Sequence, residues 1–298
     1  STLPTAFGEK MVMRIFDPDN TVKDLDALGF SAHDAARWEA LVQRPHGIIL
    51  VTGPTGSGKT TTLYSTLRRL ATDEVNVSTV EDPIEMIEPA FNQTQVQPQL
   101  DFGFTEGLRA LMRQDPDIIM VGEIRDLETA EMAIQAALTG HLVLSTLHTN
   151  DAPSAITRLL ELGVPYYLLK ATLLGVMAQR LVRTLCSHCK APVEIDETDW
   201  NNLTRPWSAP LPTQACRAVG CPECRDTGYR GRAGVYEIML LNESIKPLIT
   251  ADTDLIALRR QAFKEGMRSL RLSGAQKVAG GQTTIEEVLR VTPQSEQK

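Results

Sequence analysis

Gly53-Pro-Thr-Gly-Ser-Gly-Lys-Thr60 follows directly on the apolar run Ile48-Ile-Leu-Val-Thr52. An apolar run that leads into a glycine-rich turn is typical of a buried strand, a phosphate-binding loop and a helix. The glycines let backbone N–H groups converge on a polyphosphate, Lys59 can reach the outer phosphates, and Thr60 can offer a hydroxyl to Mg²⁺. We therefore expect a nucleotide-binding loop formed by Gly53, Pro54, Thr55, Gly56, Ser57, Gly58, Lys59, Thr60 and Thr61.

The composition limits the classes of protein to which the chain can belong. It has 298 residues, of which 42% are hydrophobic and 22% charged, as expected for a globular protein of about two domains. A net charge of −7 and an aromatic content of 5% argue against an extended nucleic-acid surface, so we expect no nucleic-acid partner. The sequence begins without the basic segment and long apolar core of a signal peptide, which predicts a cytoplasmic location.

Beyond the loop, apolar runs alternate with helical patterns, which is typical of an α/β fold with a parallel sheet. We expect strands at 48–52, 75–81, 117–122 and 141–146, and helices from 59, at 105–113, 126–138, 254–266 and 284–290. The apolar stretch 166–182 contains Lys170, Gln179 and Arg180, so it is interpreted as a buried helix rather than a membrane span.

Two acidic segments supply further parts of a nucleotide site. Ile118-Ile-Met-Val-Gly-Glu123 is an apolar strand that ends in an acid, which brings Glu123 to the same sheet edge as the phosphate loop. Val80-Glu-Asp-Pro-Ile-Glu85 places three carboxylates after another expected strand. Phosphoryl transfer to water needs a carboxylate that positions the water and a metal held across the phosphates. Both segments are candidates for these tasks, with a surface acid and a solvated turn as the alternatives.

Histidine and arginine side chains could complete the site. His148 ends an apolar strand, where it either reports the state of the γ-phosphate to a neighbouring segment or has a structural role. Arg109, Arg113 and Arg125 lie near acidic elements, so ion pairing within the fold competes with contact to phosphate. Arg14 lies far from this core in the sequence and could reach a nucleotide from another domain or subunit.

Two C-x-x-C pairs predict a metal centre, because a tetrahedral thiolate site needs two such chelating pairs. Zinc is the expected ion, and four protein ligands would make the site structural rather than catalytic. Residues 190–220 between the pairs form a longer gap than in an ordinary zinc ribbon, so this segment must fold back on itself. Redox disulfides are the alternative, and His188 and Cys216 are interpreted as bystanders. The proposed ligands are Cys186, Cys189, Cys221 and Cys224.

Four segments together resemble the secretion ATPase superfamily. Residues 53–60, 79–85, 113–126 and 140–150 are similar to its Walker A, Asp box, Walker B and His box, in that order. The chain resembles the type II secretion ATPases (GspE) most, and the type IV pilus assembly ATPases (PilB) second. The resemblance implies a RecA-like core, ATP and Mg²⁺ as ligands, a homohexamer, and work on a pseudopilus or pilus through inner-membrane partners to which the protein is peripheral.

The resemblance also implies roles for individual residues. Lys59 and Thr60 would hold phosphate and Mg²⁺, Glu85 would polarise the attacking water, and Glu123 would support the metal, although the two carboxylates could exchange roles. Arg14 matches an arginine with which family members approach the nucleotide from the preceding domain.

A division into four parts follows. We expect the end of an N-terminal α+β domain and a linker at 1–44, the RecA-like ATPase core at 45–182, the tetracysteine zinc subdomain at 183–232 and a C-terminal helical region at 233–298. Two other functions stay open: a nucleic-acid translocase with a similar core, and a nucleotide-binding scaffold with little turnover.

Overall fold

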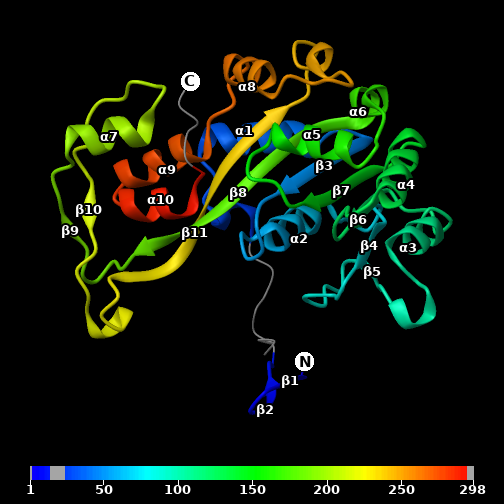
Figure 1. Cartoon of the computed structure of the whole chain (residues 1–298), viewed down its shortest axis with the longest axis horizontal. Coiled ribbons are helices and arrows are strands. Elements are labelled where there is room, and N and C mark those ends of the chain that lie inside the picture. The colour runs from blue at the N-terminus through cyan, green and yellow to red at the C-terminus, as the bar shows by residue number, and fades with distance from the viewer. Residues whose placement is uncertain (1, 14–23, 294–298) are drawn as a thin grey trace.

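A seven-stranded sheet forms the centre of the computed structural model, which describes residues 2–13 and 24–293 (Figure 1). The strand order is β11-β8-β3-β7-β6-β4-β5, and all neighbouring strands are parallel except the edge strand β11, which is antiparallel to β8. The expected α/β fold with a parallel sheet is confirmed. The strands are β3 (Gly47–Thr52), β4 (Val77–Glu81), β5 (Asn92–Gln95), β6 (Ile118–Val121), β7 (Leu142–Leu147), β8 (Leu173–Leu185) and β11 (Tyr229–Leu240).

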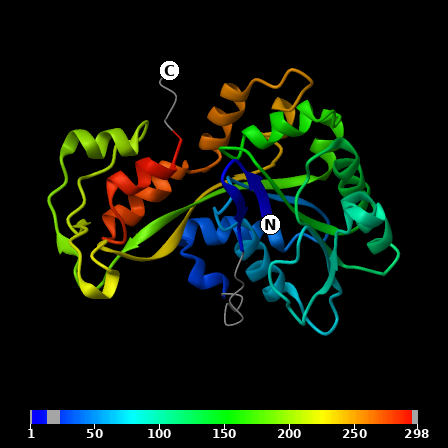
Figure 2. The same ribbon diagram turned by 60° about the horizontal axis from the view of Figure 1, so that its bottom comes forward.

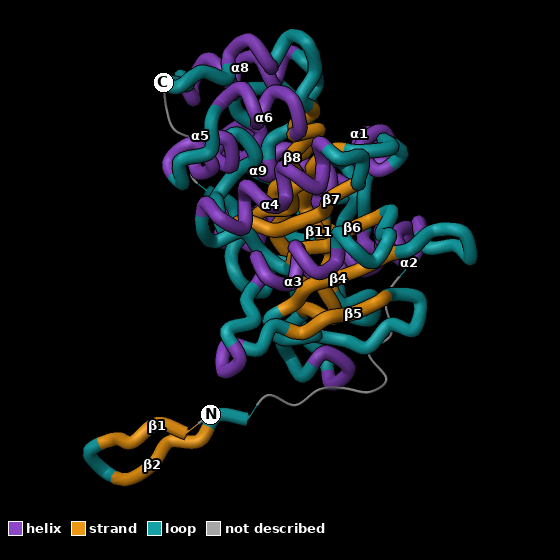
Figure 3. The backbone as a smooth tube through the Cα atoms, turned by 90° about the vertical axis from the view of Figure 1, so that its right-hand side faces the viewer, coloured by secondary structure: helices purple, strands orange, loops and turns teal. Residues whose placement is uncertain are grey.

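Helices cover both faces of the sheet, because alternate residues of its strands point to opposite sides. Ile49 and Val51 of β3 pack with the side of α1 and α2, whereas Ile48 and Leu50 pack with the side of α3, α4 and α5. Figure 3 shows α3 and α4 on one side of the stacked strands and α1 and α2 on the other. These helices are α1 (Ala32–Val42), α2 (Lys59–Leu70), α3 (Phe104–Leu111), α4 (Leu127–Leu138) and α5 (Ser154–Glu161).

The long strands β8 and β11 continue past the sheet as a two-stranded ribbon toward a small lobe (Figures 1 and 2). The lobe holds the antiparallel pair β9 and β10, so residues 190–220 do fold back as expected. Helices α9 and α10 pack along the ribbon. The remaining strands and α-helices of the described residues are β1 (Thr2–Thr5), β2 (Gly8–Met11), α6 (Tyr166–Thr172), β9 (Ala191–Pro192), α7 (Glu197–Thr204), β10 (Cys216–Arg217), α8 (Leu255–Lys264), α9 (Leu270–Ala279) and α10 (Ile285–Val291).

The buried helix expected over 166–182 is wrong. Only the seven residues of α6 are helical there, and the chain then enters β8 at Leu173. Because β8 lies inside the sheet between β3 and β11, most of it is buried on both faces. A strand covered on both faces has a near-continuous apolar sequence, which periodicity cannot distinguish from a buried helix.

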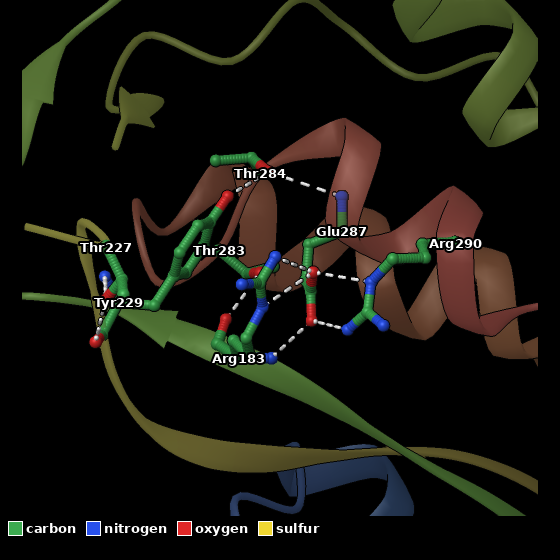
Figure 4. A network of polar contacts seen from close by, with 7 residues as sticks. All are labelled: Arg183, Thr227, Tyr229, Thr283, Thr284, Glu287 and Arg290. Atoms are coloured by element: carbon green, nitrogen blue, oxygen red, sulfur yellow. Dashed lines mark hydrogen bonds and ion pairs between the residues drawn. The ribbon is translucent and has the colours of Figure 1, made fainter. Parts of the chain in front are cut away.

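A buried carboxylate attaches the C-terminal helix to the ribbon (Figure 4). Glu287 of α10 is 1% exposed and accepts hydrogen bonds from the backbone N–H and the guanidinium of Arg183, at 3.0 Å and 2.8 Å. Arg290 donates to the same carboxylate at 2.6 Å. Tyr229 stacks against Arg183, with the guanidinium 4.1 Å from the ring centroid, and its hydroxyl lies 3.0 Å from that of Thr284. The last helix, α10, is therefore fixed to β8 and β11.

Some expectations are not tested by these elements. Arg14 falls outside the described residues. The division at 44, 182 and 232 stays a prediction; β8 and β11 each run across one of these positions. Among the helices of residues 2–13 and 24–293, none has the length and apolar character to cross a bilayer.

Candidate functional site

The glycine-rich loop lies between β3 and α2, and β8 supports it from behind. Gly53 has φ +150°, and a Cβ there would lie 2.5 Å from the backbone oxygen of Gln179. Gly58 has φ +89°, and its Cβ would lie 2.8 Å from Nε2 of the same glutamine. Both positions combine positive φ with close approach to β8, so only glycine fits without displacement. The loop backbone is thereby held against the sheet.

Two side chains of the loop indicate a polar ligand. The Ser57 hydroxyl is buried and is the one buried side-chain oxygen or nitrogen without a hydrogen-bond partner in the described part of the chain. Lys59 donates to the backbone oxygens of Gly53 at 2.8 Å and Pro54 at 3.2 Å. Burial lowers the pKa of Lys59, and the nearby charge of Glu123 acts in the opposite direction. An anion at the start of α2 would give the Ser57 hydroxyl its missing partner and would lie beside the ammonium group of Lys59.

An open cleft of about 990 Å³ brings the predicted residues together. Glu85 reaches it from the loop after β4, Glu123 and Arg125 from the turn after β6, and His148 from the end of β7. The parallel strands all end at this edge of the sheet, as expected for a ligand site in an α/β fold. The predicted residues that line the cleft are Thr55, Gly56, Ser57, Gly58, Lys59, Thr60, Thr61, Glu85, Glu123, Arg125 and His148.

Glu123 is held by two neighbouring side chains of this cleft. Its side chain is 16% exposed, pairs with Arg125, and has one oxygen 3.4 Å from Nε2 of His148. Burial acts to raise the pKa of Glu123, but the hydrogen bond and charge of Arg125 and the contact with His148 outweigh it and lower the pKa. Arg125 also lies 3.8 Å from Asp82. Glu123 is therefore ionised. For Arg125 the sequence left two possibilities, ion pairing within the fold and contact to phosphate, and in this structure Arg125 makes ion pairs.

The donor atoms of the cleft suit a magnesium nucleotide. Thr60 and Glu123 offer a hydroxyl and a carboxylate, which are the oxygen donors that Mg²⁺ prefers. Lys59 and the backbone of the loop offer positive charge and N–H donors to phosphate. Together with the unpaired Ser57 hydroxyl, these groups fit ATP and Mg²⁺.

A buried polar cluster supports the loop that follows His148, and sequence patterns did not reveal it. Glu237 of β11 accepts from the backbone N–H of Ala152 at 2.9 Å, and Asp151 pairs with Arg259 of α8 at 2.8 Å. Arg180 of β8 donates to the backbone oxygen of Asn150 at 2.9 Å. Burial first, and Asp151 second, raise the pKa of Glu237 to about 7. No local motif marks these residues, because the contacts join segments far apart in the sequence.

The four cysteines of the two C-x-x-C pairs meet in the small lobe. Their Sγ atoms lie within 4.8 Å of one another, and those of Cys186 and Cys221, Cys189 and Cys224, and Cys221 and Cys224 are 3.9, 3.8 and 3.7 Å apart. Zn–S bonds of 2.3 Å in a tetrahedron require sulfur atoms about 3.8 Å apart. All four thiols are free rather than disulfide-bonded, and the arrangement fits a zinc ion.

The surroundings of the thiols agree with this fit. The backbone N–H groups of Cys221 and Gly228 donate to the sulfur of Cys224, and that of Gly220 donates to the sulfur of Cys189, as expected for sulfur atoms that carry negative charge when a metal is bound. Within the described residues, the metal-binding group contains neither His188 nor Cys216. That these two residues are bystanders stays a prediction.

Known proteins are similar to this chain in sequence. The family model described as Type II/IV secretion system protein matches residues 1–290. The type IV pilus assembly ATPase TfpB of Acinetobacter baylyi is 61% identical over 98% of this chain and 50% of its own length. The type II secretion system ATPase E of Vibrio cholerae is 50% identical over 99% of this chain and 58% of its own length. The chain thus spans between 50% and 58% of the length of these two relatives.

A solved structure extends the likeness to the fold. The crystal structure of the pilus retraction motor PilT with bound ADP superposes with a TM-score of 0.67 at 29% identity, covering 93% of this chain and 69% of that one. The family model covers almost the whole chain, and the phosphate loop, both acidic segments and His148 occupy one cleft. The chain belongs to the family of type II and type IV secretion system proteins.

Proposed function

We propose that the cleft hydrolyses ATP and that the chain is part of a molecular motor. The observation that carries this proposal is that the glycine-rich loop, Glu85 and Glu123 line one cleft. Phosphoryl transfer to water needs these three parts: a phosphate cradle, a carboxylate beside the attacking water and a ligand for the metal. The ATPase names of two relatives and the ADP-bound PilT neighbour support the same activity.

Each residue has one task in this proposal. Lys59 binds the outer phosphates. To do so, its ammonium group exchanges the backbone oxygens of the loop, which it contacts in this structure, for phosphate oxygens. Thr60 and Glu123 would hold Mg²⁺, which would supply positive charge against the phosphates. Glu85 orients the water and accepts its proton. His148 contacts Glu123, so its position responds to the state of that carboxylate.

Neighbouring subunits are expected to complete the site. The cleft is open, and Arg14, far from it in the sequence, is proposed to supply positive charge to the phosphates from another domain or subunit. A homohexamer is the proposed assembly, by the family resemblance. Zinc at the four cysteines is proposed to hold the small lobe together, because four protein ligands leave no open position.

The cellular role proposed first is pseudopilus assembly and protein export by a type II secretion system. The motor would be cytoplasmic and bound to the inner membrane through platform proteins. The second candidate is type IV pilus assembly, which the 61% identity to the Acinetobacter relative favours over the 50% identity to the Vibrio ATPase. Deletion of the gene, scored for secreted proteins and for surface pili, separates the two roles.

Two substitutions test the hydrolysis itself. Lys59→Ala should abolish nucleotide binding or turnover, because it removes the charge of the cradle. Glu85→Gln should leave nucleotide binding nearly intact and slow hydrolysis by orders of magnitude. A general base typically contributes about 10²- to 10⁴-fold to a rate, and this contribution would be lost. Undiminished ATPase activity in Lys59→Ala would refute the motor, and equal loss of binding and turnover in Glu85→Gln would reassign Glu85 to structure.

A further inference from the structure

One buried carboxylate beside the cleft takes no part in the proposed chemistry. Glu81, the last residue of β4, is 3% exposed. Its oxygens accept hydrogen bonds from the Tyr64 hydroxyl at 2.5 Å, from the Thr79 hydroxyl at 2.7 Å and from Nε2 of Gln93 at 3.2 Å. These donors come from α2, β4 and β5. Glu81 is thus occupied by protein groups and acts as an anchor rather than as a base.

The groups that hold Glu81 also hold the loop that carries Glu85. Nε2 of Gln93 donates to the backbone oxygen of Met86 at 2.9 Å, and the Tyr64 hydroxyl lies 3.3 Å from the same oxygen. Oε1 of Gln93 accepts from the backbone N–H of Glu88 at 2.8 Å, which determines the orientation of the amide. The residue directly after Glu85 is therefore fixed from two elements.

The residue directly before Glu85 is fixed from the same strand. Oε1 of Gln95 accepts from the backbone N–H of Ile84 at 3.3 Å. Gln93 and Gln95 are two positions apart in β5, so their side chains leave the strand on the same face. Together they hold the backbone on both sides of Glu85, while its side chain lines the cleft.

Tyr64 connects this arrangement to the phosphate loop, because it belongs to α2, the helix that begins at Lys59. Its ring is fully buried and packs edge-on against Phe91, with 5.7 Å between the centroids. Burial first, and the hydrogen bond to Glu81 second, raise the pKa of Tyr64, so its hydroxyl stays a donor. The helix of the phosphate loop and the loop of Glu85 are thus joined through one hydroxyl.

We propose that Tyr64 and Gln93 are positioning residues that set Glu85 relative to the phosphate loop, with Glu81 as their shared anchor. This inference rests on the proposed role of Glu85 in hydrolysis. The mechanism is geometric: a catalytic group that is misplaced by about 1 Å can lose about 100-fold in rate. The two residues touch no substrate and act only through the loop.

Tyr64→Phe tests the proposal because it removes the hydroxyl and keeps the ring against Phe91. In the assembled protein at fixed concentration, we expect kcat to fall by about 10- to 100-fold, while the affinity for a fluorescent ATP analogue stays within about twofold. Gln93→Met removes the contact between β5 and the loop, and it should likewise lower kcat without changing the affinity for the analogue. If Tyr64→Phe does not fold, Gln93→Met serves as the test. Tyr167→Phe, on the exposed face of α6, is the matched control and should leave both values unchanged.

A double-mutant cycle with Glu85→Gln separates positioning from general structural damage. If Tyr64 acts through Glu85, Tyr64→Phe should lower kcat in the wild type and have no further effect in Glu85→Gln. Additive losses, or a fall in nucleotide affinity that matches the fall in kcat, would overturn the inference while the role of Glu85 stands. Wild-type turnover in Glu85→Gln alone would instead overturn the proposed role of Glu85, and this inference with it.

Discussion

Replacing Glu287 with glutamine should loosen the C-terminal helix from the ribbon of β8 and β11. The carboxylate is 1% exposed and receives donors from both Arg183 and Arg290 (Figure 4). Glutamine keeps the size of the side chain but loses the charge, and its amide group cannot accept from two guanidinium groups in the same way. The substitution therefore tests the charge of the Glu287 contact with Arg183 and Arg290 rather than the packing of the side chain.

The pKa of Glu287 gives the magnitude. Burial acts to raise the pKa, but hydrogen bonds from Arg290 and Arg183 outweigh it and lower the pKa from 4.5 to about 2. At about 1.4 kcal/mol per pKa unit, this corresponds to at most about 3 kcal/mol of stability at neutral pH. Because the side chains of Arg183 and Arg290 are 45% and 59% exposed, solvent weakens the pairs, and we expect about 1 to 2 kcal/mol.

The sign of the pH dependence follows from the lowered pKa. The contribution is fully present above pH 4.5, where the carboxylate is ionised in both states, and is lost as the pH falls through about 2. Urea unfolding should show Glu287→Gln less stable than wild type at pH 7, with the difference shrinking below pH 4.5. The neighbouring, exposed Glu286→Gln is the control and should change little. A difference that does not depend on pH would refute the charge argument.

Three further predictions concern the zinc centre, the buried acid of β11 and the phosphate loop. Metal analysis should find about one zinc per chain, and Cys221→Ser should release it and destabilise the lobe; a metal-free protein of undiminished stability would exclude the site. Burial raises the pKa of Glu237 to about 7, so ionisation of this acid costs stability above pH 7. Glu237→Gln should therefore raise the free energy of unfolding above pH 7, by at most about 3 kcal/mol, and should have no such effect below pH 4.5. Urea unfolding at pH 8 that shows the variant no more stable than the wild type would contradict this. Gly58→Ala should cost about 1 to 2 kcal/mol and weaken nucleotide binding, because φ is +89°, whereas Gly280→Ala, which has ordinary φ and space, should not.

The sequence predicted those parts of the fold that local patterns encode. The glycine spacing before Lys59 is local, and so is the alternation of strands and helices between β3 and β7. The two C-x-x-C pairs are equally visible, since a chelating pair lies within one turn. By contrast, the prediction of a helix over 166–182 was wrong for the part that forms β8. Burial of this strand on both faces removes the alternation of polar and apolar residues that identifies a strand.

The site was predictable only for residues that belong to such patterns. The structure brings Glu85, Glu123 and His148 to the cleft with the phosphate loop, while their catalytic roles stay predictions. Tyr64 and Gln93 carried no signal, because a tyrosine in a helix and a glutamine in an edge strand are ordinary residues. Their contacts appear only when α2 and β5 pack beside β4.

One strand, β8, runs from the phosphate loop to the small lobe that contains the four cysteines. Gln179 of β8 accepts a hydrogen bond from Thr62 of α2 at 2.9 Å and lies against Gly58. Further along, Arg183 pairs with Glu287, and Cys186 follows the end of the strand. At about 3.3 Å per residue, Gln179 and Cys186 are about 23 Å apart along the strand. The strand is paired with β11 along the ribbon, apart from an irregularity between Tyr229 and Arg232, and Glu287 ties it to α10 through Arg183. A metal centre at the four cysteines would therefore lie at the far end of a strand that contacts the phosphate loop.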